Sequence, residues 1–184
     1  MARRAEKTSD SRAYLLAVTL RAMPDRATDD DEFRPLPSHY RMCFGCGEEH
    51  PTGLHMKVFG SKDRVVGSFL VTEHHQGAPG LAHGGVIAAA VDEAMGFLIY
   101  LLAAPAVTVH LEVDYRKPVP VGSVLELETH VEKIDGRKVY AVLTGRADGV
   151  VHVEASSIYV KVTVEHFRPH YERQGEKLIR PYNP

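Results

Sequence analysis

Residues 84–102 read GGVIAAAVDEAMGFLIYLL, an almost continuously apolar stretch that Asp92 and Glu93 interrupt near its middle. The stretch is long enough for one helix, and Pro105 marks where that helix should end. An acidic side chain at the centre of a membrane span costs roughly 2.5–3.5 kcal/mol. Two adjacent acids therefore predict no membrane span here. They predict a helix buried inside the protein, with its acids facing polar groups.

Segments typical of β-strands lie on both sides of this stretch. Two precede it, at 54–59 and 64–72, and four follow it, at 107–119, 124–134, 138–147 and 150–164. Asp135-Gly136 and Asp148-Gly149 are signals for hairpin turns between the last three segments. This order predicts an α+β fold in which one antiparallel sheet wraps around one long central helix.

The two ends of the chain differ in character from its middle. We predict an N-terminal extension and linker over residues 1–36, the folded domain over 37–166 and a polar C-terminal tail over 167–184. The 184 residues carry a net charge of -2 with acids and bases mixed, so no basic block indicates a nucleic-acid partner. The N-terminus lacks the long apolar run of a signal peptide, so a cytoplasmic location is expected.

The triplet His83-Gly84-Gly85 stands at the head of the predicted helix. The first N–H groups of a helix have no partner within it, and glycine lets a substrate carbonyl approach them closely. The triplet therefore indicates a site that holds a developing oxyanion. The alternative is that the glycines only allow a tight turn from the loop into the helix.

Asp92 is the candidate catalytic base, because a carboxylate on an apolar helix is costly unless it has a role. The alternative is a structural aspartate that accepts hydrogen bonds. Glu93 points about 100° away from Asp92, so we expect it to meet solvent, a salt bridge or a subunit boundary. Gly84 and Asp92 lie roughly 12 Å apart along one helix, too far to act on one carbonyl. If both act, they come from two chains, and the active unit is at least a homodimer with two equal sites.

Thr108 lies in an alternating strand at 107–115, where it shares one predicted face with His110, Glu112 and Asp114. Its hydroxyl is a candidate to orient a water molecule or the Asp92 carboxylate. The alternative is an ordinary β-branched strand residue.

Cys43 and Cys46 are the two cysteines of the chain. Their Cys-x-x-Cys spacing suits zinc, with His39 or His50 completing the ligands, but the usual second ligand pair is missing. We therefore predict two small buried thiols in a turn and no metal site.

Taken together, these residues resemble the hotdog-fold thioesterases. The resemblance rests on His83-Gly84-Gly85-Val86 through Asp92, on Thr108 and on Asp114-Tyr115-Arg116-Lys117-Pro118. It covers about residues 43–164 and includes Cys43-Phe44-Gly45-Cys46-Gly47 and Pro51-x-Gly53-Leu54, a start seen in some bacterial members. The chain is similar to the phenylacetate-pathway (PaaI-like) branch and its mammalian acyl-CoA thioesterase relatives, which implies the hotdog fold.

The resemblance also implies a role for each site residue. The Gly84 N–H would polarise the thioester carbonyl, Asp92 of the partner subunit would activate water or attack directly, and Thr108 would assist it. His83 would shape the loop and touch the thioester region. Many members carry Asn at the position of Gly77. The neighbouring Gln76 is the candidate to replace it, and both are expected along the substrate with Gly85.

The implied activity is the hydrolysis of an acyl-CoA thioester to a free carboxylic acid and CoA, in a homodimer or a dimer of such dimers. No cofactor is expected, because CoA is part of the substrate. The CoA phosphates favour cations, and the candidates are Arg116, Lys117, Arg137 and Lys138. Two other functions stay open: a hydratase or dehydratase of the same fold, and a non-catalytic protein that binds acyl-CoA.

Overall fold

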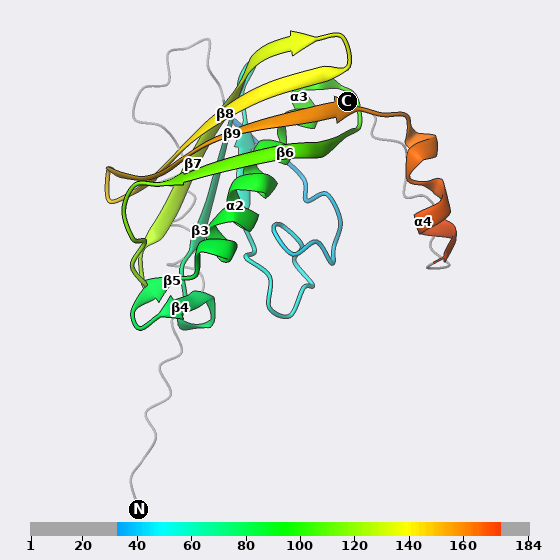
Figure 1. The fold of residues 1–184 in the computed structure, drawn as a ribbon. Coiled ribbons are helices and arrows are strands. Elements are labelled where there is room, and N and C mark those ends of the chain that lie inside the picture. Colours follow the sequence, from blue (N-terminus) through cyan, green and yellow to red (C-terminus); the bar gives the residue numbers. More distant parts are fainter. Residues whose placement is uncertain (1–32, 174–184) are drawn as a thin grey trace, which may run out of the picture.

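The computed structural model describes residues 33–173, in which a seven-stranded sheet packs on one central helix (Figure 1). The strand order is β1-β2-β3-β7-β8-β9-β6, and all neighbours are antiparallel. The bounds are Arg34–Pro35 (β1), Lys57–Gly60 (β2), Arg64–Leu70 (β3), Ala106–Tyr115 (β6), Val124–Asp135 (β7), Lys138–Ala147 (β8) and Val150–Lys161 (β9). The predicted α+β architecture is confirmed.

The apolar stretch forms α2, Gly84–Gly96, and α3, Leu98–Leu102, which meet at Phe97. One side of α2 packs on the sheet through a row of buried side chains: Ile87, Ala90, Val91, Ala94 and Met95. The other side, with Gly85, Ala89 and Asp92, is only partly covered. Gly84–Leu102 is long and apolar enough to cross a membrane, but in this fold it is the core helix. The one long helix that the sequence predicts is interrupted at Phe97.

The predicted hairpins are present. Gly136 has a φ of 58° between β7 and β8, and Asp148 and Gly149 have φ of 49° and 76° between β8 and β9. Such left-handed residues match the twist of the strands that they join. A one-residue change in the register of these strands would move every core side chain to the solvent face.

Several strand boundaries differ from the prediction, and two of them have a clear cause. β2 begins at Lys57 because the preceding residues pair with the cysteine loop: Leu54 N–H donates to Phe44 O at 2.8 Å and Met56 N–H to Gly45 O at 2.9 Å. β6 ends at Tyr115, before a segment whose proline at 118 has no N–H to continue the strand.

β6 contains an extra residue relative to its neighbour β9. Thr108 pairs with Tyr159, but His110 pairs with Ile158, so Val109 has no partner of its own. This β-bulge reverses the alternation of side chains within the strand.

The bulge decides which side chains of β6 face the helix. Thr108 reaches α2 before the bulge, and Leu111 and Val113 pack against the core after it. Val109 is 55% exposed and His110 is exposed as well. The prediction that Thr108 shares its face with His110 is therefore wrong, since the sequence does not show the extra residue.

Shorter elements complete the described chain. The hairpin of β4, Gln76–Ala78, and β5, Leu81–Ala82, lies beside the start of α2 (Figure 1). The 3-10 turns η1, Glu73–His75, and η2, Val164–His166, precede β4 and α4, and α4, Arg168–Arg173, stands apart from the sheet (Figure 1). The sheet begins at β1, before the predicted domain start at residue 37. Most of the predicted extension and tail lies outside the described residues.

Candidate functional site

The start of α2 presents a free backbone donor. His83 is the N-cap, and its Nδ1 accepts a hydrogen bond from Gly85 N–H at 2.9 Å. Val86 N–H donates to His83 O at 3.0 Å. Within residues 33–173 the N–H of Gly84 has no hydrogen-bond partner. This N–H is the donor that the family resemblance assigns to the oxyanion. The next N–H of the helix, that of Gly85, is already bonded to the His83 ring.

The loop before α2 supports this arrangement. A Cβ at Gly77 would lie 2.8 Å from His83 Cα, so the residue must be small where the loop passes His83. The Gln76 amide stabilises the β4–β5 hairpin. Its Nε2 donates to Glu73 O at 3.2 Å, and its Oε1 accepts from Gly80 N–H at 2.7 Å. Its predicted contact with substrate stays a prediction.

Tyr115 holds the first turn of α2 from the end of β6. Its hydroxyl donates to Gly84 O at 2.9 Å, and a Cβ at Gly84 would lie 3.5 Å from its ring. Sequence reasoning did not single out Tyr115 for this role, because the pairing depends on how β6 lies along α2.

Asp92 lies at the middle of α2 and faces the other end of β6. Thr108 Oγ1 donates to Asp92 Oδ1 at 2.9 Å. Tyr159 from β9 donates to the backbone carbonyl of Asp92 at 3.3 Å, and burial raises the pKa of this tyrosine, with the charge of Asp92 adding to it. Oδ2 of Asp92 has no hydrogen-bond partner among residues 33–173. The structure therefore brings Asp92 and Thr108 together as predicted.

Gly84 and Asp92 form two half-sites of one chain. They belong to one continuous helix, so roughly 12 Å of helix axis separates them. Tyr115 accompanies Gly84 and Thr108 accompanies Asp92, at opposite ends of β6. No single carbonyl reaches both half-sites within one chain.

The four basic candidates divide between the two ends of the sheet. The backbone N–H of Arg116 donates to His152 O, near the start of β9. The backbone carbonyl of Arg137 accepts from Lys161 N–H, at the end of β9. At about 3.3 Å per residue, His152 and Lys161 are about 30 Å apart. The pairs Arg116/Lys117 and Arg137/Lys138 therefore cannot contact one phosphate from the same chain.

Arg116 is already ion-paired. Its Nε lies 2.6 Å from Glu154 Oε2 and its Nη2 lies 3.1 Å from Asp114 Oδ2. The hydrogen bond with Glu154, together with the charges of both acids, raises the pKa of Arg116. Lys117 is exposed and has no ion-pair partner within the described chain.

Glu93 turns away from Asp92 towards the cysteine loop. His39 Nδ1 lies 3.0 Å from Glu93 Oε1, and the Cys43 thiol lies 3.5 and 3.3 Å from the two carboxylate oxygens. Cys46 Sγ lies 3.8 Å from His39 Nδ1. Of the three environments predicted for Glu93, the salt bridge is the one observed. Both cysteines are unbridged and lie in a turn, but only Cys46 is fully buried, so the prediction of two buried thiols holds for Cys46 alone.

The cysteine and histidine pKa values are perturbed in this cluster. A hydrogen bond with Cys46 lowers the pKa of Cys43, and the same bond together with burial raises that of Cys46. Burial by itself lowers the pKa of His39, but hydrogen bonds with Cys43 and Glu93 raise it to about 9. These hydrogen bonds thus favour the protonated imidazole of His39 and the thiolate of Cys43.

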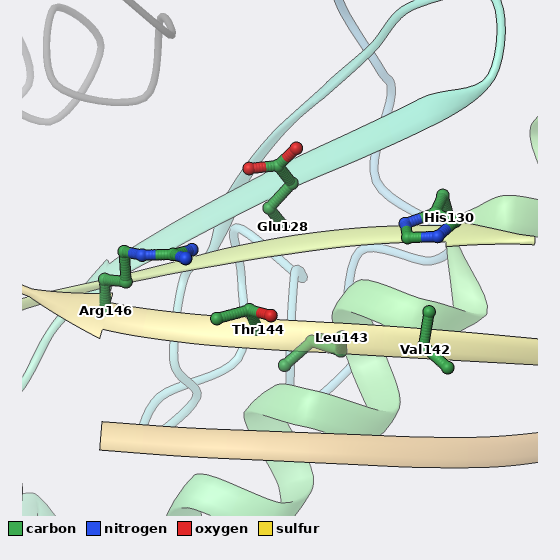
Figure 2. Close-up of a pocket in the computed structure, with 6 residues that line it drawn as sticks. All are labelled: Glu128, His130, Val142, Leu143, Thr144 and Arg146. Atoms are coloured by element: carbon green, nitrogen blue, oxygen red, sulfur yellow. The ribbon is translucent and has the colours of Figure 1, made fainter. Parts of the chain in front are cut away.

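Two hollows in the surface lie away from Asp92. Figure 2 shows one of about 190 Å³, lined by side chains of β7 and β8 that include Glu128, His130 and Arg146. The neighbouring Leu127 and Thr129 are buried on the helix side, so this hollow lies on the opposite face of the sheet.

The second hollow, also about 190 Å³, is lined by residues near the cysteine loop that include Cys46, Met56 and Phe97. Neither hollow includes Gly84 or Asp92.

Comparison with known proteins identifies the family. Residues 79–149 match the family model of the thioesterase superfamily. The chain is 37% identical over 101 residues to acyl-coenzyme A thioesterase THEM4 of Xenopus laevis, a match that covers 54% of this chain and 46% of that protein. It is 30% identical over 101 residues to PA0474 of Pseudomonas aeruginosa, which is named as an esterase, covering 49% of this chain and 75% of that protein. The chain spans about half the length of the curated THEM4 proteins that it matches.

Solved structures share the fold. A thioesterase superfamily protein, RHA08564, superposes with a TM-score of 0.63 at 24% identity, covering 86% of this chain and 81% of that chain. The E. coli PaaI protein gives a TM-score of 0.57 at 14% identity, covering 59% and 80% of the two chains. A thioesterase from Streptococcus pneumoniae with coenzyme A gives a TM-score of 0.53 at 19% identity, covering 55% and 82%. The solved structures show that the chain adopts the hotdog fold. Because the family model matches and PA0474 is 30% identical with 75% of its length covered, the chain belongs to the thioesterase superfamily.

Proposed function

We propose that this chain hydrolyses acyl-CoA thioesters in a homodimer whose two sites each combine residues of both subunits. One observation carries the proposal: Thr108 holds Oδ1 of Asp92 at 2.9 Å and leaves Oδ2 unbonded on the partly covered side of α2. A carboxylate with one oxygen oriented and the other free is suited to accept a proton from water.

The reaction follows from the two half-sites. The Gly84 N–H donates to the thioester carbonyl oxygen, where negative charge develops as the carbonyl carbon becomes tetrahedral. Asp92 takes a proton from water as the water oxygen bonds to that carbon. The C–S bond then breaks, CoA leaves as a thiolate that takes the proton back from Asp92, and the acyl group leaves as a carboxylic acid that ionises in water. His83 uses Nδ1 as an acceptor, so a neutral ring carries its proton on Nε2 as an exposed donor beside the carbonyl.

The edge strand β6 explains how two subunits unite the half-sites. β6 is the last strand of the sheet, and its backbone groups on that edge are available to pair. An antiparallel two-fold pairing centred near Leu111 places Thr108 opposite the partner's Tyr115. Asp92 then approaches the partner's Gly84, because each accompanies one of those β6 residues. The same pairing brings together the partly covered sides of the two α2 helices.

The same pairing also gathers the basic residues. Arg116 and Lys117 follow one end of β6, and Arg137 and Lys138 lie beside the other end through β9. Pairing two antiparallel β6 strands therefore brings Lys117 to the same end of the sheet as the partner's Arg137. This arrangement supports a CoA phosphate site at each end of the dimer interface.

The relatives support the substrate class. THEM4 of Xenopus laevis is named an acyl-coenzyme A thioesterase, and the pneumococcal thioesterase structure contains coenzyme A. A cytoplasmic location and assembly into a dimer of dimers stay predictions, which cell fractionation and analytical ultracentrifugation test.

Replacing Asp92 with asparagine tests the base. The side chain stays almost the same size, but it no longer accepts a proton, so kcat/KM for acyl-CoA hydrolysis should fall about 10²–10⁴-fold. Released CoA thiol is measured with a chromogenic disulfide across a panel of acyl-CoAs. Glu132→Gln is the matched control, because Glu132 is an exposed β7 acid. A loss below roughly threefold in Asp92→Asn would remove Asp92 from the mechanism. Water loss from a β-hydroxyacyl-CoA without thiol release would instead identify a dehydratase.

Mixing two inactive variants tests the shared site. One carries Asp92→Ala and the other carries Gly84→Val, which blocks the approach of the carbonyl. In a mixed dimer one site collects both changes and the other collects neither. Random exchange should therefore restore activity towards about a quarter of wild type, since about half of the dimers are mixed and each has one intact site. Absence of recovery despite proven subunit exchange would show that the two residues do not act across the interface.

A further inference from the structure

A second group of chemically reactive side chains lies behind the proposed catalytic aspartate. His39, Cys43, Cys46 and Glu93 each offer one ligand atom, and these atoms all lie within 4.8 Å of one another. The set combines nitrogen, sulfur and oxygen donors from the loop before β2 and from α2. None of these four side chains has a part in the proposed hydrolysis.

Three distances between the four ligand atoms are close to those around a tetrahedral metal ion. With Zn–S near 2.3 Å and Zn–N or Zn–O near 2.0–2.1 Å, tetrahedral angles place ligand atoms about 3.4–3.8 Å apart. Here the separations are 3.0 Å from His39 Nδ1 to Glu93 Oε1, 3.3 Å from Cys43 Sγ to Glu93 Oε2 and 3.8 Å from Cys46 Sγ to His39 Nδ1. An ion at the centre of the group therefore requires only small movements of the side chains.

Glycines beside the cysteines let the backbone lie close to the proposed ligands Cys43 and Glu93. A Cβ at Gly45 would lie 2.3 Å from Glu93 Cγ, and one at Gly47 would lie 2.5 Å from Cys43 N and O. Gly47 N–H donates to Cys43 O at 2.9 Å, which closes a tight turn. His39 N–H donates to Cys46 Sγ at 3.2 Å. Donors aimed at sulfur favour the thiolate form that binds metals.

The His39 ring is held in position for the cluster. It stacks on Phe97 with ring centroids 4.0 Å apart and on Tyr100 at 5.5 Å. Its Nε2 is buried without a hydrogen-bond partner within the described residues, so the hydrogen bonds of the ring are confined to Nδ1. The side chains of His39 and Glu93 are only 23% and 13% exposed. The ion pair between these two side chains is therefore largely withdrawn from water.

We propose that His39, Cys43, Cys46 and Glu93 bind one Zn²⁺ per chain as a closed, structural site. Two sulfurs, one imidazole and one carboxylate form a donor set that suits zinc better than magnesium or calcium, which prefer oxygen. Four protein ligands leave no open position for water, so the ion has no direct part in hydrolysis. This proposal replaces the sequence prediction of no metal site, which lacked Glu93 as the fourth ligand.

The ion would join two parts of the chain that are distant in sequence. His39, Cys43 and Cys46 belong to the loop before β2, whereas Glu93 belongs to α2 and directly follows Asp92. Metal binding would therefore fix the rotation of α2 about its axis. It would act as a positioning device for the carboxylate that faces Thr108.

Metal content tests the proposal independently of any activity. The full chain, freed of affinity tags and purified under reducing conditions without chelators, should contain close to one zinc per chain by plasma mass spectrometry. Apo-protein titrated with Co²⁺ should develop thiolate-to-metal charge-transfer absorption and tetrahedral d–d bands that saturate at one equivalent. Removing zinc should lower Tm by on the order of 5–10 °C, and adding zinc back should restore it.

Variants identify the ligands. Cys43→Ser, Cys46→Ser and Glu93→Gln should each weaken zinc binding by more than about 100-fold, since losing an outer-shell partner already costs 10–100-fold. His50→Ala is the matched control: His50 is the histidine that the sequence also offers, but it lies outside the cluster, and its loss should leave the zinc content unchanged. Circular dichroism shows which variants stay folded, and the Co²⁺ titration of the wild type needs no variant.

Three outcomes would overturn the proposal. The first is wild-type protein without zinc whose apo form gives no charge-transfer band with Co²⁺. The second is a Cys43–Cys46 disulfide in protein purified under reducing conditions. The third is loss of zinc in His50→Ala with retention in Cys43→Ser. Because none of these measures hydrolysis, a failed zinc site leaves the proposed thioesterase activity untouched, and an inactive protein that binds zinc leaves the zinc site intact.

Discussion

Replacing Thr108 with valine tests whether the orientation of Asp92 sets the rate of hydrolysis. Valine keeps the branched shape of threonine but removes the hydroxyl that donates to Asp92 Oδ1 at 2.9 Å. A hydrogen bond to a charged group contributes about 1.5–3 kcal/mol, which corresponds to roughly 10–150-fold in rate. Since Thr108 is exposed in the single chain, we expect the lower end, about tenfold.

The loss should fall on kcat and leave KM nearly unchanged, because Thr108 acts through Asp92 and not through the substrate. Steady-state thiol release over a range of acyl-CoA concentrations separates the two constants. Thr108→Ser keeps the hydroxyl and should retain activity within about threefold of wild type. Equal activity of the valine and serine variants would refute the reasoning. An equal loss in both, with a lowered Tm, would instead point to a packing role for the methyl group.

Two further predictions concern the loop and the surface. Gly77→Ala should lower the free energy of unfolding by about 1–3 kcal/mol, because its Cβ would lie 2.8 Å from His83 Cα. Denaturant unfolding measures this, and Gly96→Ala, whose Cβ would meet no atom closer than 3.9 Å, should not be destabilised; equal losses would contradict the packing argument. The double variant Lys117→Ala with Arg137→Ala should raise KM for acyl-CoA but leave KM for the matching pantetheine thioester unchanged, since only CoA carries the nucleotide phosphates. The same rise with both substrates would place these residues elsewhere in the mechanism.

The sequence by itself determined the architecture, because its strongest signals are local. The apolar stretch at 84–102, the two Asp-Gly turns and the strand segments between them depend only on hydrophobic periodicity and turn geometry. The His83-Gly84-Gly85 triplet and Asp92 also stand out locally, since helix starts and charges on apolar helices are visible without a partner. Helix geometry alone then separates Gly84 from Asp92 by roughly 12 Å, which is the argument for two subunits.

Only the tertiary structure decided which distant side chains meet. Thr108 faces Asp92 because Val109 forms a bulge, and a strictly alternating strand would not place Thr108, Leu111 and Val113 on one side. The contact of Tyr115 with Gly84 depends on how β6 lies along α2. Glu93 joins His39 and the two cysteines across about fifty residues of sequence. Periodicity carries no record of such long-range contacts, because they arise from the packing of α2 against the sheet on one side and against the cysteine loop on another.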